Sequence, residues 1–257
     1  MTFLDRNKIG NSERRRPSTD AGERIYAIGD VHGRYDLLRR LFDRINRHAE
    51  GLPEPRSTHL ILLGDVIDRG PDSARMIEFL QALQKQHSNM TVLLGNHEEL
   101  MLAVLGAHPQ AFGIWLDIGG DATLASYGVD PFAPGTQQRD IIANALAAIP
   151  PHHLAWMNEL PLSAQSGDYF FCHAGIRPGV SLKRQSPADL LRIRDEFLTC
   201  TKDHGSVIVH GHSISTTVEM PGNRIGIDTG AYYTNNLTAL YLEGEKQEVL
   251  TTMDDPR

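Results

Sequence analysis

The chain has 257 residues, of which 40% are hydrophobic and 22% are charged, so it can bury a sizeable core. Its 32 acidic and 25 basic residues give a formal charge of −7, which argues against a protein whose main task is to cover nucleic-acid phosphates. The two cysteines, Cys172 and Cys200, are too few for a disulfide framework, and we expect both to be reduced thiols.

The first 23 residues are polar and include three consecutive arginines, Arg14 to Arg16. They lack the apolar region of a secretory signal, and no apolar run in the sequence approaches the length of a membrane span. We therefore expect a flexible polar tail over residues 1–23, a single domain over residues 24–257, and a cytoplasmic protein that does not contact a membrane.

From residue 24 onwards, short apolar runs alternate with longer amphipathic stretches. The pattern predicts strands over residues 24–30, 58–65 and 90–96, and helices over residues 37–48 and 73–86. Strands that alternate with helices in this way are typical of crossover units, in which neighbouring strands run parallel.

The middle of the chain, over about residues 99–162, is predicted to be a mostly helical insertion. Short strands separated by turn signals follow it, and we expect them to form mainly a β-meander. A single helix is predicted between them, over residues 186–200.

Polar residues that can bind metals stand at the ends of five predicted strands, and in the first three blocks they directly follow a glycine. They lie in the blocks GDVHG (Asp30, His32), GDVIDRG (Asp65, Asp68), GNHE (Asn96, His97), CHAG (His173) and HGHS (His210, His212). Each block alone is typical of a turn, but ligands gather beyond the carboxyl ends of parallel strands, so five such blocks predict one shared site. Mixed Asp, Asn and His ligands suit manganese, iron or zinc better than magnesium or calcium.

These blocks, in this order, resemble those of the calcineurin-like metallophosphoesterase superfamily. The resemblance is to its phosphoprotein phosphatase branch and in particular to the short bacterial and phage serine/threonine phosphatases, while symmetrical dinucleoside tetraphosphate hydrolases carry almost the same blocks. It implies an α/β (α+β) fold, a four-layer sandwich of two mixed β-sheets flanked by helices, with a βαβ-type first half.

The resemblance also implies two divalent metal ions, for which we expect Mn²⁺, with iron or zinc as alternatives. One ion would be held by Asp30 and His32, the second by Asn96, His173 and His212, and Asp65 would bridge both. His210 precedes the ligand position in its block, and we expect it to have a structural role.

The resemblance further implies direct attack on phosphorus by a hydroxide that the two ions share. His97 would be the general acid for the leaving oxygen, and Asp68 would orient it and favour its protonated form. Arg69 would bind phosphate oxygens. Arg194 resembles a second phosphate-binding arginine, with Arg192 as the competing candidate.

Three further features have expected supporting roles. We expect Glu98 to fix the loop at the site by hydrogen bonding and to cap the next helix, and Asp228 to support a metal-ligand histidine. Residues 115–128 resemble a stretch of the bacterial members, and they would form either a cap near the substrate or a plain helical insertion.

These residues support three hypotheses of function. The first is a phosphatase that acts on phosphoserine, phosphothreonine or phosphotyrosine in proteins, and the alternative is a symmetrical dinucleoside tetraphosphate (Ap4A) hydrolase. The third is a metal-binding or phosphopeptide-binding module without catalysis. The expected partner is a phosphorylated protein or a small phosphorylated substrate, not nucleic acid, and the chain indicates no regulatory subunit.

Overall fold

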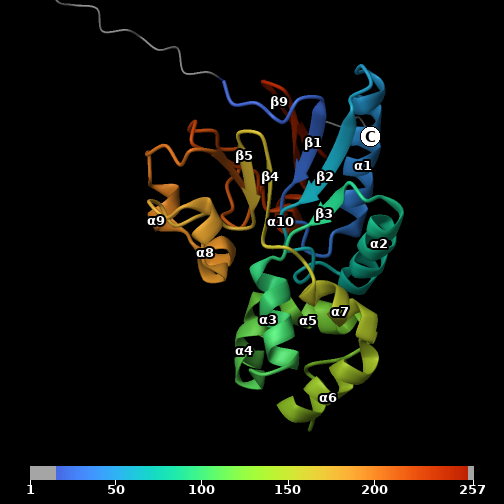
Figure 1. The fold of residues 1–257 in the computed structure, drawn as a ribbon. Coiled ribbons are helices and arrows are strands. Elements are labelled where there is room, and N and C mark those ends of the chain that lie inside the picture. Colours follow the sequence, from blue (N-terminus) through green and yellow to red (C-terminus); the bar gives the residue numbers. More distant parts are fainter. Residues whose placement is uncertain (1–15, 254–257) are drawn as a thin grey trace, which may run out of the picture.

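A computed structural model describes residues 16–253, which form two mixed β-sheets packed face to face (Figure 1). The five-stranded sheet has the order β3 (Met90–Val92), β2 (Ser57–Leu62), β1 (Glu23–Ile28), β8 (Thr238–Glu243) and β9 (Lys246–Thr251). The four-stranded sheet has the order β4 (Ser163–Ser166), β5 (Tyr169–Cys172), β6 (Val207–His210) and β7 (Arg224–Gly226). Strands β1 to β3 run parallel, as the sequence predicted.

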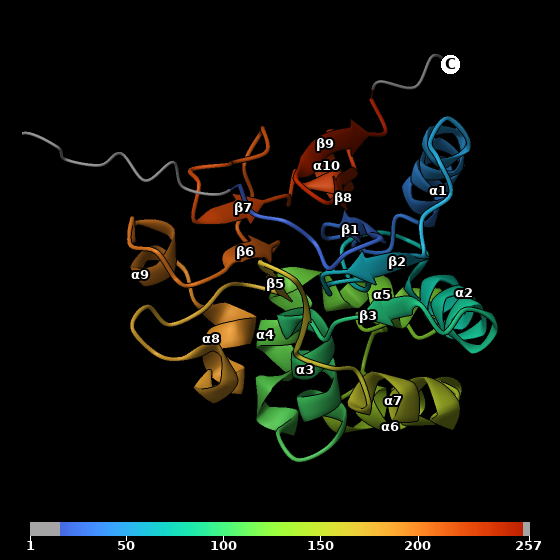
Figure 2. The same cartoon turned by 45° about the horizontal axis from the view of Figure 1, so that its top comes forward.

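Helices cover the outer faces of both sheets (Figure 2). Helices α1 (Tyr35–Glu50) and α2 (Ser73–Gln86) lie against the five-stranded sheet, whereas α8 (Pro187–Arg192) and α9 (Asp195–Leu198) lie against the four-stranded sheet. A short 3₁₀ turn (Leu182–Arg184) precedes α8, and α10 (Ala231–Thr234) precedes β8. The predicted four-layer sandwich is therefore confirmed.

Alternation along the strands separates the layers. In β1, Ile25 and Ala27 face the four-stranded sheet, while Tyr26 and Ile28 pack on the side of α1. We call the apolar layer between the sheets the inter-sheet core; its buried members are Ile25, Ala27, Ile61, Leu63, Leu93, Tyr169, Phe171, Val207, Val209, Ile225, Ile227, Leu240 and Leu242.

The helical insertion lies at the end of the five-stranded sheet where β1 to β3 finish (Figure 1). It contains α3 (Asn96–Leu105), a 3₁₀ turn (Pro109–Ala111), α4 (Phe112–Trp115), a π-helical turn (Leu116–Gly120), α5 (Asp121–Ser126), α6 (Gln138–Ala148) and α7 (Pro151–Asn158). Because α3 begins directly after β3, the insertion starts at a predicted metal ligand, Asn96.

The expected β-meander is wrong except at its end, where β8 and β9 pair antiparallel. Strands β5, β6 and β7 run parallel, and α8 and α9 lie in the crossover between β5 and β6. The predicted helix over residues 186–200 is also wrong in part, because Ile193 is extended and Arg194 has a non-helical backbone (φ −131°, ψ −106°). Apolar spacing does not detect this break, since Leu190, Ile193 and Phe197 are buried together at helical intervals.

The expected N-terminal tail falls partly outside the described residues, which exclude 1–15 and hence Arg14 and Arg15. The backbone N–H of Ser18 donates to the Asp168 carboxylate at 3.0 Å, and the N–H of Thr19 donates to the Gly244 carbonyl at 3.2 Å. These two residues therefore pack against the folded body. No helix between residues 16 and 253 has the length and apolarity to cross a membrane.

Candidate metal centre

Two groups of potential metal ligands share one carboxylate, that of Asp65. His32, Asp65 and His97 form one group, and Asp65, His173 and His212 form the other. Within each group, the ligand atoms lie within 4.8 Å of one another. A carboxylate placed between two sets of imidazoles is suited to bridge two metal ions.

His32 and His173 are oriented by backbone carbonyls. The Nδ1–H of His32 donates to the Ile67 carbonyl at 2.8 Å, and that of His173 donates to the Leu63 carbonyl at 2.9 Å. This tautomer leaves each Nε2 with a lone pair, 3.8 Å and 3.4 Å respectively from Oδ2 of Asp65. A hydrogen bond on the far nitrogen is the usual way in which a protein orients a metal-binding histidine.

Two further atoms, Nε2 of His212 and Oδ1 of Asn96, are suited to bind a cation. Nε2 of His212 is buried and has no hydrogen-bond partner among the described residues, and burial lowers the pKa of this ring to about 2. The Oδ1 atom of Asn96 lies 2.9 Å from Nε2 of His173. With the Nδ1 proton on His173, two acceptors face each other, and a cation between them removes the repulsion. The residues present therefore fit divalent metal ions.

Asp30 lies at the edge of this cluster and belongs to neither group of ligand atoms. The backbone N–H of His212 donates to both of its carboxylate oxygens, at 3.2 and 3.0 Å, and the Asp228 side chain hydrogen bonds to it. Burial and the charges of Asp228 and Asp65 raise the pKa of Asp30 well above its usual value. The Asp228 carboxyl hydrogen bonds to Asp30 and accepts from the backbone N–H of Gly230 at 2.9 Å, so the expected support of a ligand histidine stays a prediction.

Glu98 holds the backbone around the Asp65 carboxylate. Its carboxylate accepts hydrogen bonds from the backbone N–H groups of Asp65, Val66 and Ile67 at 2.9 to 3.1 Å, and from Gly95 at 2.9 Å. A Cβ on Gly95 would lie 2.2 Å from Oδ1 of Asp65, so only glycine permits this approach. The expected loop-fixing and capping role of Glu98 is confirmed.

His97 and Asp68 form a hydrogen-bonded pair next to the ligands. Nδ1 of His97 lies 2.7 Å from Asp68, and Nε2 lies 3.7 Å from Oδ2 of Asp65. Burial alone would lower the pKa of His97, but the charges of Asp65 and Asp68 raise it above its usual value. The ring therefore favours the imidazolium form, which can donate a proton.

Two residues of the helical insertion hold Asp68, and sequence reasoning assigned them no role. The Trp115 indole N–H donates to both Asp68 oxygens, and the Thr123 hydroxyl donates to one of them at 2.6 Å. The one feature of the sequence that could have pointed to them is the resemblance of residues 115–128 to a stretch of the bacterial members of the superfamily. These residues contact the residue that orients His97, so they are more than a plain insertion.

The two predicted phosphate-binding arginines lie near different predicted site residues, Arg69 near His97 and Arg194 near His212. Arg69 packs over the Tyr232 ring at 4.5 Å and approaches Nε2 of His97 at 3.3 Å. Arg194 is exposed, its side chain has no hydrogen-bond or ion-pair partner within residues 16–253, and its charge lies close enough to lower the pKa of His212. Arg192 instead forms an ion pair with Glu99.

Left-handed backbone conformations concentrate at this site. Of six non-glycine residues with positive φ in the part of the chain that the structure describes, five are predicted site residues: His32, Asp65, Asp68, Arg69 and His212. Such residues persist only where their surroundings hold them, and they cluster at functional sites. His210 has ordinary backbone geometry; it is buried, with Nδ1 3.0 Å from the Gly211 carbonyl, and belongs to neither ligand group.

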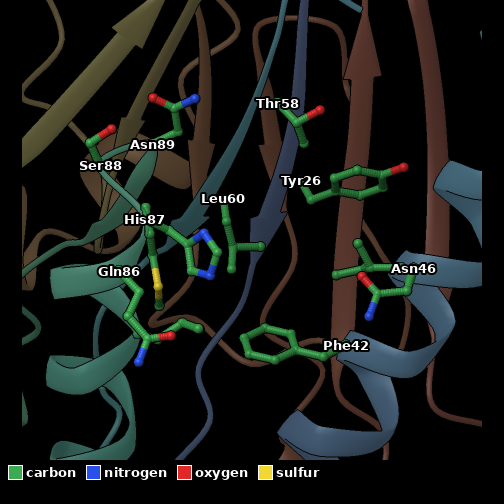
Figure 3. Close-up of a pocket in the computed structure, with 12 residues that line it drawn as sticks. Tyr26, Phe42, Asn46, Thr58, Leu60, Gln86, His87, Ser88 and Asn89 are labelled. Atoms are coloured by element: carbon green, nitrogen blue, oxygen red, sulfur yellow. The ribbon is translucent and has the colours of Figure 1, made fainter. Parts of the chain in front are cut away.

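A pocket of about 550 Å³ lies elsewhere, between α1, the end of α2 and strands β2 and β3 (Figure 3). Figure 3 shows Phe42 and His87 on either side of Leu60. None of the predicted site residues lines this pocket. The ligand chemistry, and not the depth of a cavity, therefore identifies the site.

The profile of the calcineurin-like phosphoesterase family matches residues 23–243, and the chain belongs to this family. The resemblance read from the five blocks is thereby confirmed. The asymmetrical bis(5'-nucleosyl)-tetraphosphatase PrpE of Bacillus thuringiensis is 26% identical over 247 residues, which cover 88% of this chain and 94% of that protein.

Other relatives are similar over shorter segments or in fold alone. The symmetrical bis(5'-nucleosyl)-tetraphosphatase of Methylococcus capsulatus is 32% identical over 155 residues, 60% of this chain but only 44% of that protein. A crystal structure provisionally described as a diadenosine tetraphosphatase superposes with a TM-score of 0.63 at 17% identity, covering 91% of this chain and 98% of that one. A cold-active protein tyrosine phosphatase gives a TM-score of 0.52 at 19% identity, covering 91% and 80%.

Proposed function

We propose that this chain hydrolyses phosphoric anhydrides in dinucleoside tetraphosphates at a centre of two divalent metal ions. The observation that carries the metal chemistry is the Asp65 carboxylate, which belongs to both groups of imidazole ligands. The substrate class rests on a relative that is named a bis(5'-nucleosyl)-tetraphosphatase and matches along nearly its whole length.

Six residues would hold the two ions. His32 and Asp30 lie on one side and Asn96, His173 and His212 on the other, with Asp65 between them. When bound, two divalent ions provide a water nucleophile at neutral pH and orient the phosphate. We propose manganese as the native metal, because mixed nitrogen and oxygen ligands suit it; iron and zinc meet the same requirement.

His97 would protonate the leaving oxygen. Its Nδ1 is occupied by Asp68, so the proton available for transfer is the one on Nε2, which points towards the ligands of both ions. The hydrogen bond between Nδ1 and Asp68 favours the protonated ring, which is the form that can donate.

Arg69 and Arg194 would bind the phosphate oxygens. Two contacts fix the Arg69 guanidinium. It packs against the face of the Tyr232 ring, and its Nε–H donates to the Ile118 carbonyl at 3.3 Å. Arg194 has its donors free among the described residues, so they can fork onto an incoming phosphate. Two cations near different residues of the centre suit a substrate that carries several phosphates in a row.

A phosphomonoester in a protein is the second candidate substrate. Arg194 and its neighbours Asp195 and Glu196 are exposed, so a phosphorylated side chain on another protein surface can reach the guanidinium. This reaction would use the same ligands, the same acid and the same arginines, and differs only in the leaving group.

The test compares kcat/KM of the Mn²⁺-loaded chain for diadenosine tetraphosphate and for a panel of phosphopeptides in one buffer. We expect preference for the dinucleotide; two molecules of ADP would indicate symmetrical cleavage, and ATP with AMP asymmetrical cleavage. Preference for phosphopeptides would replace the proposal by the second candidate. If both metal ions bind and neither substrate is cleaved, both substrate assignments are wrong.

A further inference from the structure

A second cluster of metal-binding side chains lies away from the centre, where α2 and α7 contact each other (Figure 1). Glu78 of α2 and His152 and His153 of the first turn of α7 place three ligand atoms within 4.8 Å of one another. None of these three residues takes part in the proposed phosphate hydrolysis.

The spacing of these atoms is close to that of a zinc site. Nε2 of His153 lies 2.9 Å from Oε2 of Glu78, and Nε2 of His152 lies 3.4 Å from the same oxygen. Bonds of about 2.0–2.1 Å from zinc to nitrogen and oxygen, in a tetrahedron, place neighbouring ligand atoms about 3.3 Å apart. The Glu78 and His152 side chains are 65% and 54% exposed, so small rotations can adjust the geometry without disturbing the core.

His153 has the orientation of a metal ligand. Its side chain is only 4% exposed, and its Nδ1 lies 2.8 Å from the Tyr127 hydroxyl. With Nδ1–H donating to that oxygen, Nε2 carries the lone pair and lies 2.9 Å from Oε2 of Glu78. A polar partner on the far nitrogen fixes the tautomer of ligand histidines and raises their basicity.

We propose that Glu78, His152 and His153 form a zinc-binding site, with water as the remaining ligand and Tyr127 as the residue that orients His153. A set of two imidazoles and one carboxylate favours zinc, because calcium and magnesium prefer ligand sets made of oxygen atoms alone. The ion would join α2, in the outer layer of the sandwich, to α7 in the helical insertion. Tyr127 extends this connection to the end of α5, the helix that carries Thr123.

The competing interpretation is a hydrogen-bonded cluster without metal, in which Glu78 accepts from both histidines. The two interpretations differ in zinc stoichiometry. In the full chain, stripped of metal and dialysed against micromolar Zn²⁺, metal analysis should find one more ion per chain in wild type than in His152→Ala or Glu78→Gln. His108→Ala, which removes another exposed histidine, should retain the wild-type count.

The same comparison in an Asp65→Asn background separates this site from the catalytic one. Here we expect one zinc ion per chain, its loss with His152→Ala, and a melting temperature that zinc raises only when His152 is present. Tyr127→Phe should weaken binding by about 10-fold or more. Equal zinc content with and without His152, in both backgrounds, would overturn the proposal, and so would binding too weak to survive micromolar dialysis.

Discussion

The indole N–H of Trp115 donates to both carboxylate oxygens of Asp68, at 3.2 and 3.1 Å. Trp115 belongs to the helical insertion, whereas Asp68 follows β2 and holds the ring of His97. A carboxylate with its oxygens held by Trp115 and Thr123 can present only one geometry to the imidazole. The insertion therefore helps to position His97, the proposed general acid.

Trp115→Phe removes this donor while it keeps an aromatic ring. The loss of a hydrogen bond to a charged group is worth about 1.5–3 kcal/mol, so we expect kcat for phenyl phosphate to fall by about 10- to 100-fold. p-Nitrophenyl phosphate, whose leaving group needs little protonation, should lose much less. Phe112→Leu alters packing next to Trp115 without touching Asp68 and should affect both substrates equally. Equal losses in Trp115→Phe would show that its role is packing alone.

Arg194→Ala and Arg192→Ala form a matched pair. The Arg194 side chain lacks a partner within the described chain, and its loss should reduce kcat/KM on the order of 100-fold while metal content stays unchanged. Arg192 is half-exposed and paired with Glu99, so its loss should cost about 0–1 kcal/mol of stability and little activity. Steady-state kinetics with metal analysis checks both, and the reverse order of effects would make Arg192 the phosphate-binding residue.

Asp65→Asn should release both catalytic metal ions together, because one carboxylate serves both groups of ligands. We expect metal analysis after dialysis against Mn²⁺ to find almost no manganese and turnover to be lost. Asp117→Asn, an exposed acidic position on the helical insertion, serves as the control and should retain manganese. Retention of one full ion in Asp65→Asn would mean that the two ions bind independently.

Glu243→Gln tests an ion pair far from the centre. Burial alone would raise the pKa of the Glu243 carboxyl, but Arg24, which donates to it at 2.7 Å, holds the pKa below its usual value of 4.5. The pair therefore stabilises the fold above pH 4.5, and this contribution is lost as pH falls through the lowered pKa. Urea unfolding should show wild type more stable than Glu243→Gln by about 1 kcal/mol at pH 7, with a difference that shrinks below pH 4.5. A difference independent of pH would contradict this account.

Most of the fold follows from apolar spacing. Met76, Ile77 and Leu80 recur at helical intervals and fix α2 with the bounds that the structure shows. The proximity of the proposed ligands could be predicted from the sequence, because each follows a predicted strand and parallel strands end at one edge of a sheet. The pairing of β6 with β7 could not be predicted, because strands of four and three residues carry too little pattern to fix their direction.

The parts that escaped prediction depend on contacts between distant segments. Thr123 and Trp115 are 55 and 47 residues away from Asp68, and nothing in their local sequence indicates that they meet it. The positive φ angles of His32 and Asp65 are equally hidden, because neither residue type favours that conformation strongly enough to be noticed. The surrounding hydrogen bonds, such as those of Glu98, impose it.

The proposed metal ligands are divided between the two sheets. Asp65 follows β2 of one sheet, while His173 and His212 follow β5 and β6 of the other. The thickness of the inter-sheet core therefore determines how far apart the two halves of the centre lie. Phe171 packs in this core, and a change in its volume would alter the gap that one carboxylate must span. Substitutions in this core must therefore keep the distance between the two sheets nearly constant. A variant that changes this distance can lose the metal centre while its fold remains stable.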